Sequence, residues 1–232
     1  MLNPWQVHTV VFDLDDTLYP ERDFVLSGFA AVDRWLRANH DVEGFESQAQ
    51  ALFAKGQRGR IFDQVLEILP TRLPAELVPT LVEVYRSHQP QLRLFADAED
   101  ALTWIATTRL HSALITDGIG AVQRGKIEAL GLCSRIGRCI VTDELGGKQF
   151  WKPHQEAFRR IMAAYPGPTD GYLYVADNPR KDFIAPHQLG WRTLRLRRAG
   201  TEHAEYEGTT DELADGEIST LASLPQFLLD RG

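Results

Sequence analysis

Cysteine is scarce in this sequence. Only Cys133 and Cys139 occur among its 232 residues, which excludes a framework of disulfide bonds and favours a reducing compartment. We interpret both thiols as small, buried hydrophobic side chains. A run of about 18 apolar residues is also missing, and residues 1–9 lack the basic and apolar regions of a signal peptide. These absences predict a cytoplasmic protein without a membrane segment.

Basic residues are also fewer than acidic residues. The chain has 25 Lys and Arg residues against 32 Asp and Glu, a net charge of −7. This sign is wrong for a protein that follows a phosphate backbone, so a nucleic acid duplex is not an expected partner. The short basic cluster of Arg195, Arg197 and Arg198 is interpreted as a solvated strand end.

The rest of the composition is typical of an ordinary globular protein. Apolar residues make up 44% of the chain and charged residues 25%. A chain of this length buries about 70% of the surface of its unfolded form, enough for a core without disulfides. The length predicts one large domain or a core with an insert.

The hydrophobic periodicity changes after the first strand and again at Pro90. A short buried strand at 9–12 is followed by four helical segments with no strand between them. Beyond Pro90, strands alternate with helices, which is typical of a parallel sheet covered on both faces. We predict an α/β fold with a sheet domain of residues 1–19 and 91–232 and a helical insert at 20–90. The expected strands cover 9–12, 112–115, 138–141, 172–175 and 192–196, with a last strand and helix within 218–229.

Acidic side chains follow two strands of this predicted sheet. Asp13 and Asp15 come directly after the first strand, and Asp177 and Asp182 come after the strand at 172–175. Ligands of open parallel sheets bind at the carboxyl ends of the strands, so these side chains are expected to converge. Clustered carboxylates need a cation, and Mg²⁺ prefers oxygen ligands. All four are candidate metal ligands, Asp182 either directly or through water.

A hydroxyl group and a lysine complete this edge. Lys152 can hold a phosphoryl group as a point charge, and Thr116 can do so as a hydroxyl donor beside the amide of Asp117. Asp13 is the candidate nucleophile, because a carboxylate can form an aspartyl-phosphate. Asp15 is the candidate acid for the leaving oxygen and base for the attacking water. Together these residues predict phosphoryl transfer.

The order of these residues resembles a known superfamily. It is similar to the four motifs of the haloacid dehalogenase (HAD) superfamily, carried here by Asp13–Leu18, Thr116, Lys152-Pro153, and Asp177 with Asp182. The match covers the whole chain. The resemblance implies a Rossmann-like core, Mg²⁺ dependence and a nucleophilic Asp13. It also implies that the helices at 20–90 are a C1-type cap that closes over the site and contributes specificity. One departure is Ala176, where many members have Gly.

The superfamily contains phosphatases, dehalogenases, phosphonatases and phosphomutases, so the resemblance does not fix the reaction. It implies that dehalogenases need no metal and lack the second aspartate, which here is Asp15, so a phosphatase fits better. We predict a Mg²⁺-dependent phosphomonoesterase for a small organic phosphate, either a sugar phosphate or a nucleotide, in a monomer or homodimer. Candidate substrate-binding cations in the helical insert are Arg58, Arg60 and Arg86.

Other functions share parts of this pattern. A signalling receiver also forms an aspartyl-phosphate on a parallel sheet, but it needs the acceptor on a later strand, where this sequence predicts the helices of 45–69. A member of the same fold that only binds a phosphorylated ligand or a partner protein remains an alternative. So does a phosphotransferase, which passes the phosphoryl group to another acceptor.

Overall fold

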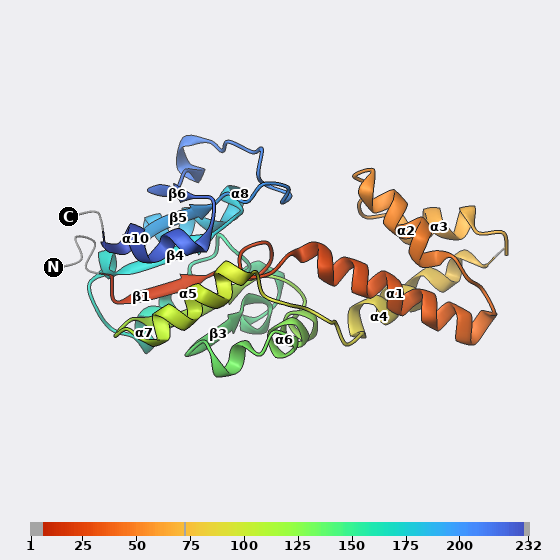
Figure 1. Cartoon of the computed structure of the whole chain (residues 1–232), viewed down its shortest axis with the longest axis horizontal. Helices are drawn as coiled ribbons and strands as arrows, with labels where there is room; N and C mark the ends of the chain where they lie inside the picture. Colours follow the sequence, from red (N-terminus) through yellow and green to blue (C-terminus); the bar gives the residue numbers. More distant parts are fainter. Residues whose placement is uncertain (1–6, 72, 230–232) are drawn as a thin grey trace. The chain divides into compact units, whose positions relative to one another are not determined.

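The computed structural model describes residues 7–71 and 73–229. The chain forms two compact units (Figure 1). The larger unit contains the chain up to Pro20 and from Arg93 onward, and the smaller unit is Glu21–Leu92. The predicted insert at 20–90 starts one residue earlier and ends two residues earlier than the smaller unit. No helix of the described ranges is both long enough and apolar enough to cross a membrane.

The larger unit is built on a parallel sheet whose described strands follow the order β3-β2-β1-β4-β5-β6. The strands are β1 (Thr9–Phe12), β2 (His111–Thr116), β3 (Arg138–Val141), β4 (Tyr172–Ala176), β5 (Arg192–Leu196) and β6 (Gly216–Ile218). β1 lies between β2 and β4, and Phe12 is in register with Leu114 and Val175. The predicted parallel α/β fold is confirmed.

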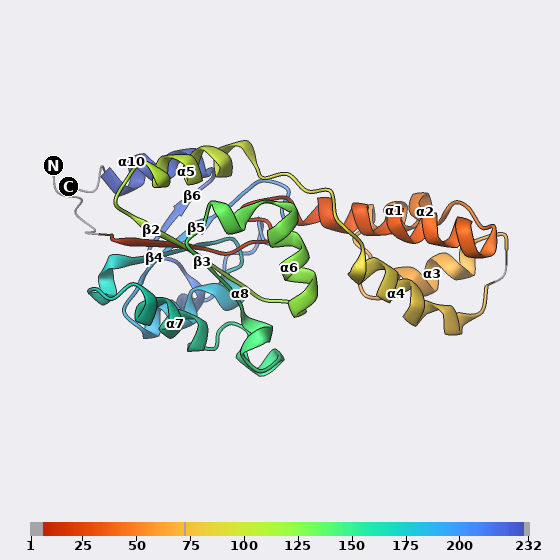
Figure 2. The same cartoon turned by 90° about the horizontal axis from the view of Figure 1, so that it is seen from below.

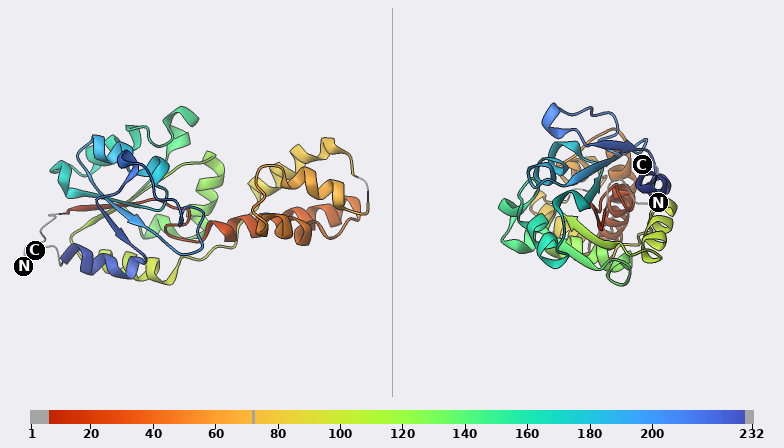
Figure 3. Two further views of the ribbon diagram at one scale, coloured as in Figure 1. Left: turned by 90° about the horizontal axis from the view of Figure 1, so that it is seen from above. Right: turned by 90° about the vertical axis from the view of Figure 1, so that its left-hand side faces the viewer.

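Helices cover both faces of this sheet. They are α5 (Ala96–Ala106), α6 (Gly120–Ala129), α7 (Glu156–Ala164), α8 (Pro179–Asp182), α9 (Ile184–Gln188) and α10 (Leu224–Leu229). α5 and α10 lie side by side on one face, and α7 lies on the opposite face (Figures 2 and 3). On the α7 side, Phe158 and Ile161 pack against Val11, Ile115 and Tyr174. Burial on both faces explains why the central strands are apolar along their length.

The smaller unit is helical throughout its regular elements in the described residues. It contains α1 (Glu21–His40), α2 (Phe45–Ala54), α3 (Ile61–Ile68) and α4 (Val78–Ser87). Phe29, Phe45 and Leu81 are buried at its centre. Gly28 lets α1 and α4 approach closely, because a Cβ atom at this position would lie 2.4 Å from the ring of Tyr85. The unit therefore has a hydrophobic core of its own.

Both cysteines depart from the predicted burial. Cys133 is exposed and Cys139 is half-buried. Cys139 lies on β3, which is at one end of the strand order, and Cys133 follows α6 in a short turn where Leu132 is the buried residue. The prediction was wrong because hydrophobic periodicity does not tell which strand forms the edge of a sheet.

The basic cluster after β5 is less solvated than predicted. The buried Arg195 donates hydrogen bonds to the carbonyl oxygens of His203 and Tyr206. Arg198 makes two hydrogen bonds of 2.8 Å to the carboxylate of Asp97. The interpretation as a solvated strand end was therefore wrong for these two arginines. Arg195 binds the loop that follows β5, and Arg198 binds α5 through Asp97.

Candidate active site

The ends of three adjacent strands position the predicted catalytic residues. Asp13 follows the last residue of β1, Thr116 is the last residue of β2, and Asp177 follows the last residue of β4. The backbone N–H of Asp13 donates to the carbonyl oxygen of Val175 at 3.0 Å. This bond extends the pairing of β1 with β4 up to the candidate nucleophile and fixes its backbone.

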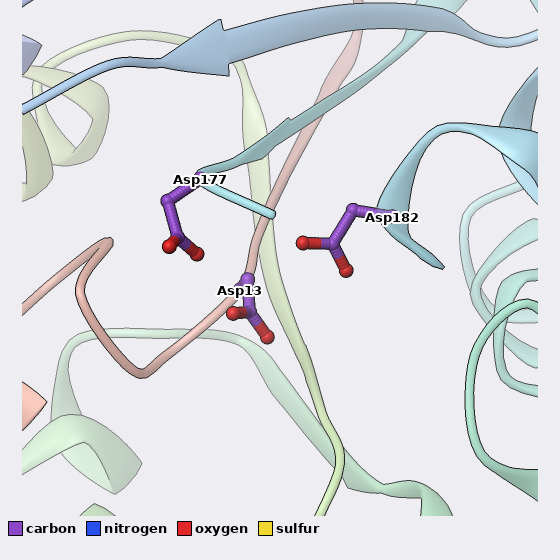
Figure 4. Close-up of side chains that lie close together, drawn as sticks. All are labelled: Asp13, Asp177 and Asp182. Atoms are coloured by element: carbon purple, nitrogen blue, oxygen red, sulfur yellow. The ribbon is translucent and has the colours of Figure 1, made fainter. Parts of the chain in front are cut away.

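Three buried carboxylates meet at this edge. Asp13, Asp177 and Asp182 each offer one oxygen atom, and these atoms all lie within 4.8 Å of one another (Figure 4). Burial raises the pKa of Asp13 to about 6. The pKa of Asp177 is held well above its usual range by burial and by the charges of Asp13 and Asp182. Such a cluster favours a hard divalent cation.

Lys152 supplies a positive charge to the same cluster. Its side chain is fully buried, and its Nζ atom lies 2.7 Å from Asp13 Oδ1 and 2.7 Å from Asp182 Oδ1. It also donates a 2.9 Å hydrogen bond to the hydroxyl oxygen of Tyr174. Burial alone would lower the pKa of Lys152, but the two carboxylates outweigh this effect and hold it well above its usual range. Lys152 is therefore a fixed ammonium group beside the candidate nucleophile.

Asp117 has a role that the sequence analysis did not foresee. Its Oδ1 atom accepts hydrogen bonds from the hydroxyl group of Thr142 at 2.8 Å and from the backbone N–H of Lys152 at 3.0 Å. Its Oδ2 atom forms an ion pair with Lys181 at 3.0 Å. Burial raises the pKa of Asp117, but Lys152 and Lys181 outweigh this effect and lower it. The carboxylate thus holds the backbone that carries Lys152.

Asp15 lies outside the three-carboxylate cluster, because its carboxylate binds donors from another element. Lys126 Nζ lies 2.7 Å from Asp15 Oδ1, and Gln123 Nε2 donates to Asp15 Oδ2 at 3.0 Å. The hydroxyl group of Tyr19 also donates to Oδ1. Burial alone would raise the pKa of Asp15, but these donors, above all Lys126, lower it.

Gln123 and Lys126 were missed by the sequence analysis. Both lie on α6, three positions apart, and both are buried. Residues at this spacing share one face of a helix. The sequence did contain a signal for them. An amide and an ammonium group lie on the core-facing side of an amphipathic helix, and buried polar groups need polar partners. The helix itself was predicted at 122–130.

The candidate arginines of the smaller unit have different surroundings. The guanidinium group of Arg58 donates to the carbonyl oxygens of Phe53 and Gln57 and lies over the ring of Phe53. Arg60 directly precedes α3, and Arg86 lies in the last turn of α4. Their role in substrate binding stays a prediction.

Comparison with known proteins identifies the family. A sequence model described as haloacid dehalogenase-like hydrolase matches residues 10–196. The chain therefore belongs to the haloacid dehalogenase-like hydrolases. This confirms the resemblance seen in the four motifs and the expectation of a hydrolase.

The relatives of this chain include two phosphatases. It is 27% identical over 222 residues to a glyceraldehyde 3-phosphate phosphatase of Methanocaldococcus jannaschii, covering 93% of this chain and 94% of the relative. It is 28% identical over 163 residues to a phosphoserine phosphatase of Thermus thermophilus, covering 70% and 63%. A magnesium-bound HAD-hydrolase of Bacillus subtilis has the same fold, with a TM-score of 0.64 at 17% identity and coverage of 96% and 98%.

Proposed function

We propose that this protein is a Mg²⁺-dependent phosphomonoesterase that acts on a small organic phosphate through an aspartyl-phosphate intermediate on Asp13. The main support is that Asp13 is buried between the ammonium group of Lys152 and the carboxylates of Asp177 and Asp182. Membership of a hydrolase family and similarity to two phosphatases support the same reaction class.

The residues present fit a magnesium ion. Lys152 forms ion pairs with Asp13 and Asp182, whereas Asp177 forms none with any residue of the described ranges. A buried carboxylate without an ion-pair partner is costly. The cluster therefore has excess negative charge, which a cation would neutralise. Asp13, Asp177 and Asp182 would hold it. Bound Mg²⁺ supplies positive charge that lets an anionic nucleophile approach an anionic phosphate.

The proposed reaction has two displacement steps. In the first, a carboxylate oxygen of Asp13 forms a bond to phosphorus, and the bond from phosphorus to the alcohol oxygen breaks. That oxygen takes the proton of Asp15, which enters this step in its neutral, protonated form and leaves it as a carboxylate. In the second, water attacks the aspartyl-phosphate and gives a proton to Asp15. Inorganic phosphate leaves, and the carboxylate of Asp13 is restored. Dividing one difficult displacement into two in this way is the general advantage of covalent catalysis.

Lys152 and Thr116 hold the phosphoryl group in this proposal. The ammonium group of Lys152 offers charge, and the hydroxyl group of Thr116 offers a hydrogen bond to a phosphoryl oxygen. Because both side chains are buried and have fixed partners, little reorganisation is needed when charge develops in the transition state.

A sugar phosphate is the favoured substrate class, with a nucleotide as the alternative. The similarity to a glyceraldehyde 3-phosphate phosphatase supports this choice, since that alignment covers nearly the whole chain. Arg58, Arg60 and Arg86 of the smaller unit are the proposed substrate-binding cations.

Phosphate release tests the proposal. The purified chain is incubated with sugar phosphates, nucleotides and other phosphomonoesters, with Mg²⁺ or with a chelator, and Asp13→Asn is assayed in parallel. We expect metal-dependent release that the variant loses. Absence of release from every compound would instead support a phosphotransferase or a member that only binds its ligand.

A further inference from the structure

The carboxylate of Asp15 is held at both of its oxygen atoms. Oδ1 accepts from Lys126 at 2.7 Å and from the hydroxyl group of Tyr19, and Oδ2 accepts from Gln123 at 3.0 Å. Rotation of the carboxylate about its Cβ–Cγ bond would break these hydrogen bonds together. The orientation of Asp15 is therefore set by α6, an element 111 residues away along the chain.

Both α6 residues are buried, and their polar groups are aimed at the site. Gln123 is 2% exposed and Lys126 is 4% exposed. Burying an ammonium group and an amide costs free energy unless their donors are satisfied, and Asp15 accepts from both. Arg124, which lies between them in sequence, is solvent-exposed and pairs with Glu144. Of these two basic side chains of α6, Lys126 directs its charge toward the site and Arg124 does not.

Gln123 also connects Asp15 to the phosphate-binding hydroxyl group. Its Nε2 atom lies 2.6 Å from Thr116 Oγ1 and 3.0 Å from Asp15 Oδ2. A carboxylate repels the carbonyl end of an amide, so Asp15 fixes which end of Gln123 faces inward. The same nitrogen then donates to Thr116 Oγ1. The hydroxyl group of Thr116 donates to the carbonyl oxygen of Asp117 at 3.5 Å, the long limit of a hydrogen bond. A phosphoryl oxygen at a shorter distance would therefore be the better acceptor.

Gly118 makes room for this arrangement. It has a φ of +132°, and a Cβ atom at this position would lie 3.0 Å from the side chain of Gln123. A larger residue would press on the side chain of Gln123, and the positive φ disfavours any residue other than glycine. The segment Thr116-Asp117-Gly118 therefore accommodates Gln123 as well as contributing to the phosphate site.

We propose that Gln123 and Lys126 are positioning residues that orient the carboxylate of Asp15 for proton transfer. Gln123 also links this carboxylate to the hydroxyl group of Thr116, because its amide nitrogen donates a hydrogen bond to each. This inference rests on the proposed phosphatase function. Neither residue touches the reacting atoms in this scheme, and both act through Asp15 or Thr116. Their removal should therefore affect protonation of the leaving group more than the capture of phosphate by Lys152.

The leaving group separates this role from a purely structural one. An alkyl phosphate such as glycerol phosphate needs a proton on its leaving oxygen, whereas para-nitrophenyl phosphate has a stable leaving anion. For each variant, kcat/KM is measured on both compounds, since it reports the steps up to the first irreversible one. In Lys126→Met and Gln123→Leu, we expect the ratio of alkyl to aryl kcat/KM to fall about 10- to 100-fold. Lys126→Arg should restore part of it.

The matched control removes the same charge from the same helix. Arg124→Met should keep the wild-type ratio, because Arg124 pairs with Glu144 and not with Asp15. In an Asp15→Asn background, Lys126→Met should lower the ratio no further, which shows that Lys126 acts through Asp15. Circular dichroism verifies folding, and Gln123→Leu carries the test if Lys126→Met does not fold.

The possible failures are distinguishable. A wild-type protein without Mg²⁺-dependent phosphatase activity contradicts the proposed function. An active wild-type protein whose folded Lys126→Met and Gln123→Leu variants keep the wild-type ratio overturns the positioning role alone. In that case, the two residues only neutralise and fill the space around Asp15.

Discussion

The ammonium group of Lys152 lies 2.7 Å from Oδ1 of Asp13, and the two residues are 139 positions apart in sequence. Their side chains are almost completely buried. At this distance and burial, the pair interacts far more strongly than an exposed ion pair would. Lys152 therefore sets the charge around the candidate nucleophile, and we expect it to affect both stability and activity.

Removal of Lys152 is expected to weaken the protein in two ways. Lys152→Met leaves Asp13 and Asp182 buried without their counter-charge, which should lower the free energy of unfolding by about 3–5 kcal/mol. Loss of the charge on the phosphoryl group should lower kcat/KM by about 10²- to 10³-fold. Chemical denaturation and phosphate release measure the two effects. The exposed Lys148 provides the control, and Lys148→Met should change neither value appreciably.

Asp13→Asn should abolish turnover and leave the fold intact. The substitution is nearly isosteric, but an amide does not replace a carboxylate as the nucleophile, so we expect a loss of about 10⁴-fold or more. Circular dichroism checks the fold, and mass spectrometry of acid-quenched wild-type protein checks for a phosphorylated Asp13. Wild-type rates in the variant would remove Asp13 from the mechanism.

Asp177→Asn should weaken the response to metal. With one carboxylate fewer in the cluster, the Mg²⁺ concentration that gives half-maximal activity should rise by about tenfold or more. The measurement is a Mg²⁺ titration of phosphate release after treatment with a chelator. Glu128→Gln removes an exposed acid from α6 as the control. An unchanged titration curve for Asp177→Asn would argue against a metal at this cluster.

Asp15→Asn should slow reactions that depend on a proton for the leaving oxygen. General acid catalysis contributes about 10²- to 10⁴-fold, so kcat/KM on an alkyl phosphate should fall within that range. The loss on para-nitrophenyl phosphate should be much smaller. Equal losses on both compounds would show that Asp15 does not donate a proton to the leaving group.

Asp97 gives a prediction about stability and pH. Burial raises its pKa, but hydrogen bonds from Arg198 and Thr220 outweigh this effect and lower it below the ordinary value of 3.8. A group whose pKa is lower in the folded state adds stability above its unfolded pKa and loses it as the pH falls through the folded value. At neutral pH, Asp97→Asn should therefore lower the free energy of unfolding by about 2 kcal/mol.

The difference between wild-type protein and Asp97→Asn should shrink below about pH 4, where the carboxylate becomes protonated in the unfolded chain. Denaturant unfolding at several pH values measures it. The exposed Asp100 on the same helix is the control, and Asp100→Asn should have an effect of less than about 0.5 kcal/mol. A difference that does not depend on pH would show that the Arg198 ion pair is not its cause.

Much of the core and part of the site were predictable from local patterns. The apolar run at 9–12 ends at Asp13, and such a run becomes a buried strand whatever its partners are. The convergence of Asp13, Asp177 and Asp182 followed from the rule that parallel strands present their carboxyl ends at one edge. Periodicity could not show which strand is an edge or what covers it, so the burial of Cys139 and Arg198 was predicted wrongly.

The sequence by itself determined which chemical groups stand at the strand ends, because strand formation and the turns that follow depend on neighbouring residues. Only the tertiary structure decided how those groups are paired. In the folded chain, the carboxylate of Asp15 forms an ion pair with Lys126, and that of Asp182 forms one with Lys152. The physical reason is that an ion pair between distant residues depends on strand register and helix placement, and these are set by packing of the whole core.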